Sequence, residues 1–318
     1  MANKTLKEAK SNKKDEFYTL IEDISEELNN YKKHFKDKVV LCNCDDPEWS
    51  NFWIFFHQNF EEFGLKKLIS THYNKDGSSS YVMEYTGGND VDPKDWHQRS
   101  LKGNGDFASE ECIELLKEAD ITCSNPPFSL FRSYLSLLIE HNKKFIIWAN
   151  NNCITYKEVF PLIKENKMWL GYMSNKTCHF RIPNDYEKYD KKFTEQRNDG
   201  YRYATVPAIS TFTNLDIPKR HFELLPSLKK EFANHPELYQ KYDNYDAINV
   251  DKVKDIPYDY YGIIGVPITF IDKYNPDEFE IINLDRYVED NPKFGHRFTI
   301  DNKETYARIL IRRKEYDE

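Results

Sequence analysis

The sequence lacks the segments by which several classes of protein are recognised. No apolar run in its 318 residues approaches the ~20 residues that a membrane-spanning helix needs. The N-terminal stretch, MANKTLKEAKSNKKDE, is polar and contains no apolar core of the kind found in a secretory signal. We therefore expect a cytoplasmic protein.

Common signatures of ligand binding are also absent. The sequence has no GxxxxGK[ST] phosphate loop, and no GxGxxG motif followed by a strand and an acidic residue, which argues against dinucleotide binding. The six cysteines form no pair of CxxC units and no Cys/His ladder, so no metal site is predicted. We expect reduced and mostly buried thiols at Cys42, Cys44, Cys112, Cys123, Cys153 and Cys178.

Basic residues are fewer than acidic ones, with 45 Lys and Arg against 53 Asp and Glu. The formal net charge of -8 weighs mildly against a nucleic-acid partner, which usually meets a basic surface, although net charge does not set the local field. Five lysines lie within residues 1–14, which we predict to be a mobile basic arm. Such an arm would contact phosphates with little sequence discrimination, and a merely solvated tail is the alternative.

Aromatic residues are abundant, with 22 Tyr and 21 Phe. This content argues against disorder despite 31% charged residues, and the length suffices for one large domain or two modest ones. Apolar β-branched runs alternate with segments of helical apolar spacing. We expect strands at 38–44, 65–71, 121–123 and 144–150, and helices at 17–35, 49–63, 109–118, 130–141 and 155–166.

This alternation predicts an α/β fold. Strands that alternate with helices of this length indicate βαβ units and a parallel sheet covered by helices on both faces. Residues 74–104 are interpreted as an insertion, with a hairpin as one form it takes. Beyond residue 174 the alternation fails, and Tyr-rich, Pro-punctuated segments indicate irregular structure or a second, less regular domain.

Polar turns follow the predicted strands where ligands bind in open α/β sheets, outside the carboxyl ends. The turns are Asp45-Asp46-Pro47, Gly105-Asp106-Phe107 and Asn125-Pro126-Pro127-Phe128. Carboxylates there can accept hydrogen bonds from a ribose or an adenine amine, and a phenylalanine ring can lie on an adenine face. Taken singly, the two aspartates after the first strand could instead cap the next helix, and Gly-Asp could be a plain turn.

The Asn-Pro-Pro-Phe turn suits the activation of a planar amine. Such an amine must lose the delocalisation of its lone pair before it attacks an electrophile. The Asn125 side-chain oxygen and the Pro126 carbonyl are two acceptors for its N–H groups, and the two prolines hold that carbonyl rigidly. Phe128 can stack on the substrate ring. A proline-rich turn without a chemical role is the alternative.

The NPPF motif resembles the catalytic motif of amino-methyltransferases that use S-adenosylmethionine (SAM). The assembly of segments resembles more closely the EcoRI-type adenine-N6 DNA methyltransferases. The segments that carry this resemblance are DEFYT at 15, CNCDDP at 42, GLKKLI at 64, GDF at 105, NPPFSLFR at 125, ITYKEVF at 154, LIKENKMWLG at 162, TNLD at 213, KYDNYDAINV at 241 and GVPITF at 265.

The resemblance implies a Rossmann-like SAM-dependent methyltransferase sheet and a site that needs no metal. Its catalytic residues would be Asn125, Pro126, Pro127 and Phe128. Its cofactor-binding residues would be Phe17, Tyr18 and Thr19, at a helix start that suits a carboxylate, with Cys44, Asp45, Asp46, Pro47, Asp106 and Phe107. One feature departs from the pattern, since His72 and Tyr73 stand where an acid usually holds the ribose.

The function implied is transfer of a methyl group from SAM to a flipped adenine in double-stranded DNA, within GAATTC, which protects the DNA from a cognate endonuclease. Residues 15–173 would form the catalytic domain, and residues 174–318 the remaining strands and the target-recognition region. An RNA base methyltransferase, a protein glutamine methyltransferase and a non-catalytic DNA-binding regulator are the alternatives.

Because the chain has one NPPF motif, no repeat and no heptad pattern, we expect a monomer.

Overall fold

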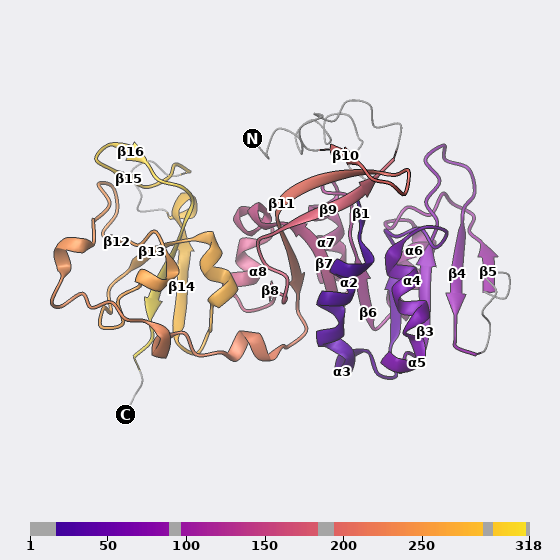
Figure 1. Cartoon of the computed structure of the whole chain (residues 1–318), viewed down its shortest axis with the longest axis horizontal. Helices are drawn as coiled ribbons and strands as arrows, with labels where there is room; N and C mark the ends of the chain where they lie inside the picture. The colour runs from indigo at the N-terminus through magenta and orange to yellow at the C-terminus, as the bar shows by residue number, and fades with distance from the viewer. Residues whose placement is uncertain (1–16, 89–96, 184–193, 289–294, 316–318) are drawn as a thin grey trace. The chain divides into compact units, whose positions relative to one another are not determined.

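The computed structural model describes residues 17–88, 97–183, 194–288 and 295–315 (Figure 1). The chain divides into two compact units. Unit 1 contains Met1–Asn151 and Leu170–Leu215, and unit 2 contains Asn152–Trp169 and Asp216–Glu318. The predicted basic arm lies outside the described residues, and the functional division expected at residue 173 stays a prediction.

Unit 1 is built on an eleven-stranded sheet in the order β1-β9-β11-β7-β6-β2-β3-β4-β5, with β8 and β10 also paired to β11. The four central strands are parallel and almost wholly buried. These are β2 (Val39–Cys42), β3 (Lys67–Thr71), β6 (Ile121–Ser124) and β7 (Lys144–Asn150). Their Val, Ile and Leu content matches strands that are covered on both faces.

The expectation of a parallel sheet is wrong outside this centre, because the outer strands pair antiparallel. One edge has β4 (Tyr81–Tyr85) and β5 (His97–Ser100); the other has β11 (Arg202–Thr213), β9 (Lys176–Ile182) and β1 (Tyr18–Thr19), with β8 (Trp169–Leu170) and β10 (Thr194–Gln196) beside β11. A short link joins β3 to β4, and antiparallel strands tolerate such a link whereas parallel strands need a crossover of a dozen residues or more. The hairpin expected in the insertion corresponds to β4 and β5.

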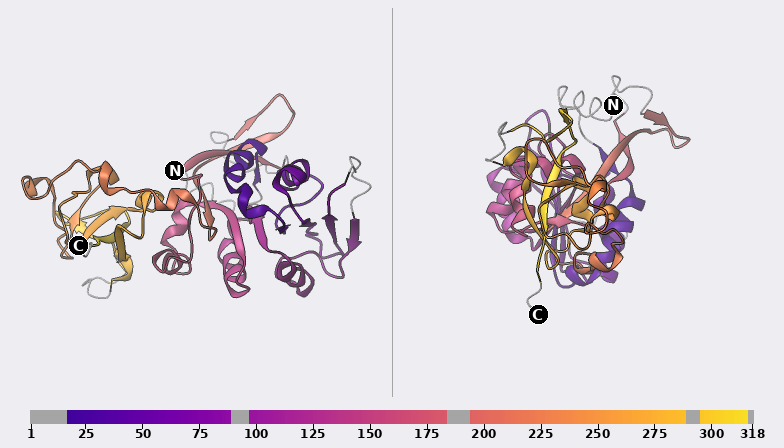
Figure 2. Two further views of the ribbon diagram at one scale, coloured as in Figure 1. Left: turned by 90° about the horizontal axis from the view of Figure 1, so that it is seen from below. Right: turned by 90° about the vertical axis from the view of Figure 1, so that its left-hand side faces the viewer.

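Helices cover both faces of this sheet (Figure 2). The indigo helices α2 and α4 lie on one side, and the magenta helices α6 and α7 on the other. The helices of unit 1 are α2 (Ile21–Leu28), α3 (Lys32–Phe35), α4 (Asn51–Gln58), α5 (Phe60–Phe63), α6 (Glu110–Glu118) and α7 (Phe131–Glu140), with the 3₁₀ turn η1 (Asn29–Tyr31) between α2 and α3. The Ser50 and Ser109 side chains cap α4 and α6, and Gly64, with φ of 62°, ends α5.

Unit 2 is less regular than unit 1. A four-stranded sheet in the order β12-β13-β17-β14 is combined with a small hairpin, β15-β16. Its strands are β12 (Ile248–Asn249), β13 (Ile264–Pro267), β14 (Phe279–Leu284), β15 (Thr299–Ile300), β16 (Lys303–Glu304) and β17 (Arg308–Arg313). The helix expected at 155–166 is shorter, α8 (Phe160–Lys164), preceded by η3 (Asn151–Thr155). The remaining 3₁₀ turns are η5 (Pro218–His221), η6 (Leu225–Ser227), η7 (Pro236–Leu238), η8 (Val253–Asp255), η9 (Ile268–Lys273) and η10 (Asp285–Tyr287).

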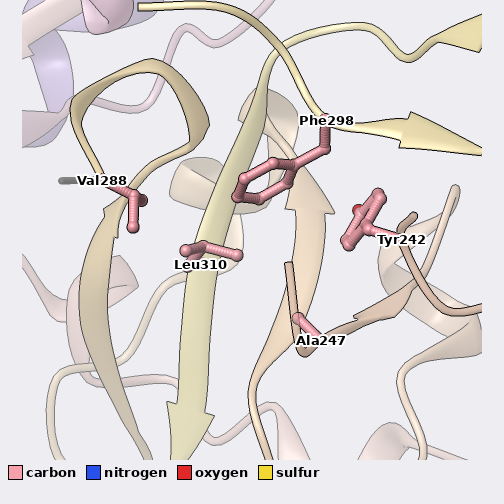
Figure 3. Close-up of a cluster of buried hydrophobic side chains, with 5 residues drawn as sticks. All are labelled: Tyr242, Ala247, Val288, Phe298 and Leu310. Atoms are coloured by element: carbon pink, nitrogen blue, oxygen red, sulfur yellow. The ribbon is translucent and has the colours of Figure 1, made fainter. Parts of the chain in front are cut away.

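A cluster of buried side chains stabilises unit 2, formed by Tyr242, Ala247, Val288, Phe298 and Leu310 (Figure 3). The rings of Tyr242 and Phe298 lie 4.8 Å apart. The cluster joins the segment before β12 to β17, so the Tyr-rich stretch around residue 242 belongs to a packed core. Across the described part of the chain, no helix has both the length and the apolar character to cross a membrane.

Candidate active site

The predicted polar turns meet at the carboxyl ends of the central parallel strands, which we call the carboxyl edge of the sheet. β2 and β6 are parallel neighbours, in register at Val40 with Ile121 and at Leu41 with Thr122, and β3 lies on the other side of β2. The chain therefore leaves the carboxyl ends of β2 and β6 side by side, where the direction of strand addition reverses. Ligands of open α/β sheets bind at such a position.

Asp45, after β2, is bonded to the turn after β6. Its Oδ2 accepts hydrogen bonds from the Ser124 hydroxyl at 2.6 Å and from the Asn125 backbone N–H at 3.4 Å. Its Oδ1 accepts from the Ser50 hydroxyl at 3.0 Å. Burial raises the pKa of the Asp45 carboxyl to about 7, and these three hydrogen bonds moderate that rise. The alternative that Asp45 and Asp46 cap the next helix is wrong, because Ser50 caps α4.

Asn125 is buried, and its side-chain amide bonds one partner within the described ranges. The Nδ2 group donates to the backbone carbonyl of Phe17 at 2.6 Å. Because a carbonyl can only accept, this bond determines which end of the amide is the oxygen. The Asn125 Oδ1 atom is shielded from solvent and has no hydrogen-bond partner among the described residues. Buried polar atoms rarely stay unpaired, so this oxygen is an acceptor available to a bound molecule.

Three phenylalanine rings pack against one another beside Asn125. The Phe128 ring is 5.2 Å from the Phe17 ring and 6.3 Å from the Phe180 ring of β9, and Phe17 lies 5.7 Å from Phe180. Pro126 is buried, and the Pro127 carbonyl accepts from the Leu130 N–H at 2.8 Å, which closes the turn before α7. The turn is therefore rigid, with an apolar surface next to a polar amide.

The N-terminal segment meets this turn, although not as the sequence predicted. Tyr18 and Thr19 form strand β1 against β9, and the helix begins only at Ile21, so the expected placement of Phe17–Thr19 at a helix start is wrong. The Thr19 carbonyl accepts from the Asn51 side chain of α4 at 2.7 Å. Pairing with β9 brings Phe17, but not a helix terminus, to Asn125.

Asp46 faces β3 instead of β6. Its Oδ2 lies 2.5 Å from Nδ1 of His72, and its Oδ1 accepts from the Glu48 N–H at 2.9 Å. Burial is the largest influence on the Asp46 carboxyl and raises its pKa, while the imidazole opposes that rise. The His72 ring stacks on Tyr81 at 4.8 Å, whereas Tyr73 is exposed. Of the two residues that replace the expected acid, His72 is therefore the one at this edge of the site.

The Gly-Asp-Phe turn packs against the same edge. Gly105 has φ of 81°, and a Cβ there would overlap the backbone carbonyl oxygen of His72. Oδ1 of Asp106 accepts from the Ala108 N–H at 2.8 Å, which shapes the turn before α6. The Phe107 ring meets Tyr134 edge to face at 5.1 Å. Glycine at 105 is thus required for the close approach of this turn to the end of β3.

Three residues of this site were missed by the sequence analysis. The Tyr134 hydroxyl of α7 donates to Oδ1 of Asn43, and the Asn43 Nδ2 has no hydrogen-bond partner among the described residues. Ser124 bonds Asp45, as described above. Tyr134 fits the apolar spacing of its helix, and such a pattern does not reveal a polar contact. Asn43 and Ser124 are polar residues at the ends of apolar strands. This position in the sequence could have indicated that they belong to the site.

The remaining predicted residues also lie near this edge. Cys44 is half-buried, and burial raises the pKa of its thiol well above the usual value; Pro47 is buried. All six cysteines are free. In the ranges that the structure describes, no group of three or more His, Cys, Asp or Glu side chains is placed to hold a metal ion. The polar groups of the site are carboxylates, amides and hydroxyls, which are suited to hydrogen bonding.

Comparison with known proteins identifies relatives over almost the entire chain. The family model described as "Adenine-specific methyltransferase EcoRI" matches residues 5–314. The type II methyltransferase M.EcoRI of Escherichia coli is 49% identical over 98% of this chain and 97% of its own length. The type II methyltransferases M.MgeORF184P of Mycoplasma genitalium and M.MpnI of Mycoplasma pneumoniae are each 39% identical over 96% of this chain, and over 98% and 97% of their own lengths. No solved structure matches the chain.

The family match spans both units and includes the NPPF turn, the Asp45 turn and the Gly-Asp-Phe turn. The chain therefore belongs to the EcoRI family of adenine-specific methyltransferases, and it is an enzyme, an adenine-specific DNA methyltransferase.

Proposed function

We propose that this enzyme transfers a methyl group from SAM to the N6 amine of a flipped adenine in duplex DNA, and that Asn125 accepts a hydrogen bond from that amine. The observation that carries the proposal is the buried Asn125 Oδ1, which has no hydrogen-bond partner among the described residues and whose orientation follows from the bond between Nδ2 and the Phe17 carbonyl. An acceptor held in this way needs no reorganisation when the substrate arrives.

The residues of the turn would act on the adenine, not on the methyl donor. Asn125 Oδ1 and the Pro126 carbonyl accept from the two N–H groups of the amine, which favours its pyramidal, nucleophilic form. Phe128 stacks on the base. As the new N–C bond forms, the donor's S–C bond breaks and the amine releases one proton. Extruding the base from the duplex costs a few kcal/mol, which stacking and hydrogen bonds offset.

The methyl donor would bind at the same edge of the sheet. The turn Cys44–Pro47, the Gly-Asp-Phe turn with Asp106 and Phe107, and the segment Phe17–Thr19 form the proposed cofactor site. Phe107, packed edge to face on Tyr134, offers a ring to the donor's adenine. The contacts among these segments support the assignment, since Asp45 bonds the turn after β6, the Phe17 carbonyl accepts from Asn125, and Gly105 lies against the His72 carbonyl just after β3.

Site specificity would come from residues 174–318. We propose GAATTC as the target and protection against a cognate endonuclease as the role, as the relationship to M.EcoRI suggests. Small differences in the residues that contact bases can change a target sequence, so the site needs its own test. We propose further that the enzyme acts as a monomer in the cytoplasm.

Labelled SAM tests this proposal directly. The protein is incubated with a duplex containing one GAATTC site, a duplex with one base pair of that site changed, an RNA and a protein mixture. The expected result is label in the first duplex alone, together with resistance of that duplex to an endonuclease that cuts GAATTC. Label in both duplexes would contradict the target, label in RNA or protein would favour an alternative substrate, and no label at all would favour a non-catalytic regulator.

A further inference from the structure

We propose that Asp45 is a positioning residue for Asn125, through which the turn after β2 holds the catalytic turn after β6. The inference rests on the proposed role of Asn125 and adds a residue whose side chain acts through another. The family resemblance places Asp45 with the cofactor-binding residues, whereas the contacts of its carboxylate point to the neighbouring strand.

One oxygen of this carboxylate bonds two consecutive residues of the catalytic turn. Oδ2 accepts from the Ser124 hydroxyl at 2.6 Å and from the Asn125 N–H at 3.4 Å. Asn125 is therefore held at both ends: its backbone by Asp45, and its side-chain amide by the Phe17 carbonyl at 2.6 Å. A shift of the carboxylate would move the Asn125 backbone and, with it, the direction of Oδ1.

Asp45 is itself held by two further elements. Its Oδ1 accepts from the Ser50 hydroxyl of the α4 cap at 3.0 Å, and its backbone carbonyl accepts from the Ser70 hydroxyl of β3. The three serines, Ser50, Ser70 and Ser124, are all buried. The Ser50 hydroxyl, the Ser124 hydroxyl and the Asn125 N–H therefore already occupy the carboxylate, which favours a supporting role over a direct contact with the methyl donor.

The charge state of the carboxyl group decides whether it can accept from all three donors. The groups around it that titrate are Cys42 of β2, Cys44 and Asp46 of its own turn, Cys123 of β6 and Tyr134 of α7. Burial raises the pKa of the three thiols and of the tyrosine, so they are neutral near pH 7. None of these groups supplies a positive charge, and the hydrogen bonds from Ser124, Ser50 and Asn125 are the main influences that lower the Asp45 pKa.

The test uses two variants of the full-length enzyme and one control. Asp45→Asn keeps the shape but cannot accept from every donor, because its amide nitrogen must face a donor. Ser124→Ala removes the shortest bond to the carboxylate. Asp76→Asn, at an exposed turn of the same unit, is the control. For each we would measure the single-turnover methylation rate at saturating SAM from pH 5.5 to 8.5, and the SAM dissociation constant by calorimetry.

A positioning role predicts a loss of rate without a matching loss of affinity. We expect Asp45→Asn to lower the saturated rate about tenfold or more, while the SAM dissociation constant stays within about threefold of the wild-type value. Ser124→Ala is expected to lower the rate less and to move the midpoint of the pH–rate profile upward, since a donor that lowers the carboxyl pKa is lost. Ser124→Thr, which keeps a hydroxyl, is expected to restore the midpoint, and Asp76→Asn to behave as wild type.

Two results would overturn the inference. One is a wild-type saturated rate in Asp45→Asn, and weakened SAM binding in the same variant would further make Asp45 a cofactor ligand. The other is an unchanged pH midpoint in Ser124→Ala. If Asp45→Asn does not fold, the comparison of Ser124→Ala with Ser124→Thr still decides. Asn125→Ala, measured in parallel, separates the two hypotheses: full activity there contradicts the proposed function, whereas its loss beside an active Asp45→Asn contradicts this inference alone.

Discussion

The side-chain amide of Asn125 donates to the backbone carbonyl of Phe17 at 2.6 Å, across a separation of 108 residues. The bond joins the N-terminal segment to the turn after β6, and the amide oxygen has no hydrogen-bond partner in the part of the chain that the structure describes. Strand β1 holds Phe17 in place by pairing with β9, and the Phe17, Phe128 and Phe180 rings pack together. Folding of the N-terminal segment and orientation of the Asn125 amide are therefore coupled.

Replacing Asn125 by alanine is expected to remove most methylation while leaving SAM affinity nearly unchanged, because we propose that the amide acts on the target amine and not on the methyl donor. By analogy with the loss of one preorganised hydrogen-bonding group, the rate should fall by on the order of 10²-fold or more. Single-turnover rates and calorimetry measure the two effects. Asn198→Ala, at an exposed turn, is the control, and a near-wild-type rate in Asn125→Ala would remove this residue from the mechanism.

Replacing Asp106 by alanine is expected to weaken SAM binding by about 1–3 kcal/mol, because an acceptor for the cofactor is lost. The same change removes the bond from the Ala108 N–H that shapes the turn. Asp106→Asn separates the two effects, since its side-chain oxygen can still accept from Ala108. Calorimetric affinities equal to wild type in both variants would exclude Asp106 from the cofactor site.

Gly105→Ala is expected to destabilise the protein and weaken SAM binding. The new Cβ would overlap the His72 carbonyl oxygen, and φ of 81° is unfavourable for alanine. Gly77→Ala is a matched control, because Gly77 has the same φ of 81° but open space around it. Thermal unfolding of both variants separates the backbone effect, about 1 kcal/mol, from the overlap. Equal losses in the two variants would show that the approach to His72 does not matter.

Glu27 gives a pH-dependent stability that can be measured. Its buried carboxylate accepts from the Tyr31 and Thr211 hydroxyls at 2.8 Å each and from the Tyr172 N–H at 2.9 Å. Burial raises its pKa above 4.5, and the hydrogen bonds oppose that rise. A raised folded pKa means that stability from this group is complete below 4.5 and is lost as pH rises through the folded pKa.

The wild type should therefore lose unfolding free energy relative to Glu27→Gln as pH rises from 4.5 through the folded pKa of Glu27. Denaturant unfolding of the two proteins at several pH values measures the difference. Stability curves that run parallel across these pH values would contradict a raised pKa for Glu27.

A monomer has one base pocket, so a palindromic site must be methylated one strand at a time. Hemimethylated DNA is expected to be a substrate and to appear as an intermediate under single-turnover conditions, because the enzyme must reorient between strands. Strand-resolved analysis of quenched reactions measures the intermediate. Methylation of both strands in one turnover, with no hemimethylated species, would contradict the monomer.

The centre of the fold and the location of the site follow from local sequence patterns. The apolar runs that form β2, β3, β6 and β7 predict buried strands, and the NPPF and Asp-Asp-Pro turns lie where those strands end. Family resemblance then supplied the chemistry that the pattern alone leaves open.

Contacts between distant segments could not be predicted in this way. The pairing of β1 with β9, the bond from Ser124 to Asp45 and the bond from Tyr134 to Asn43 each join residues far apart in the chain. Their formation depends on tertiary packing, and the residues involved look locally like helix, strand or core. The same limit explains why Phe17–Thr19 were expected at a helix start.

Nucleoside analysis of methylated DNA tests the central claim most directly. A duplex with one GAATTC site is incubated with the enzyme and SAM, digested to nucleosides and analysed by mass spectrometry, with Asn125→Ala in parallel. The account predicts N6-methyl-2′-deoxyadenosine as the sole new nucleoside with wild-type enzyme, and almost none with the variant. A methylated cytosine, adenine methylated at another nitrogen, or equal amounts of product from both proteins would contradict it.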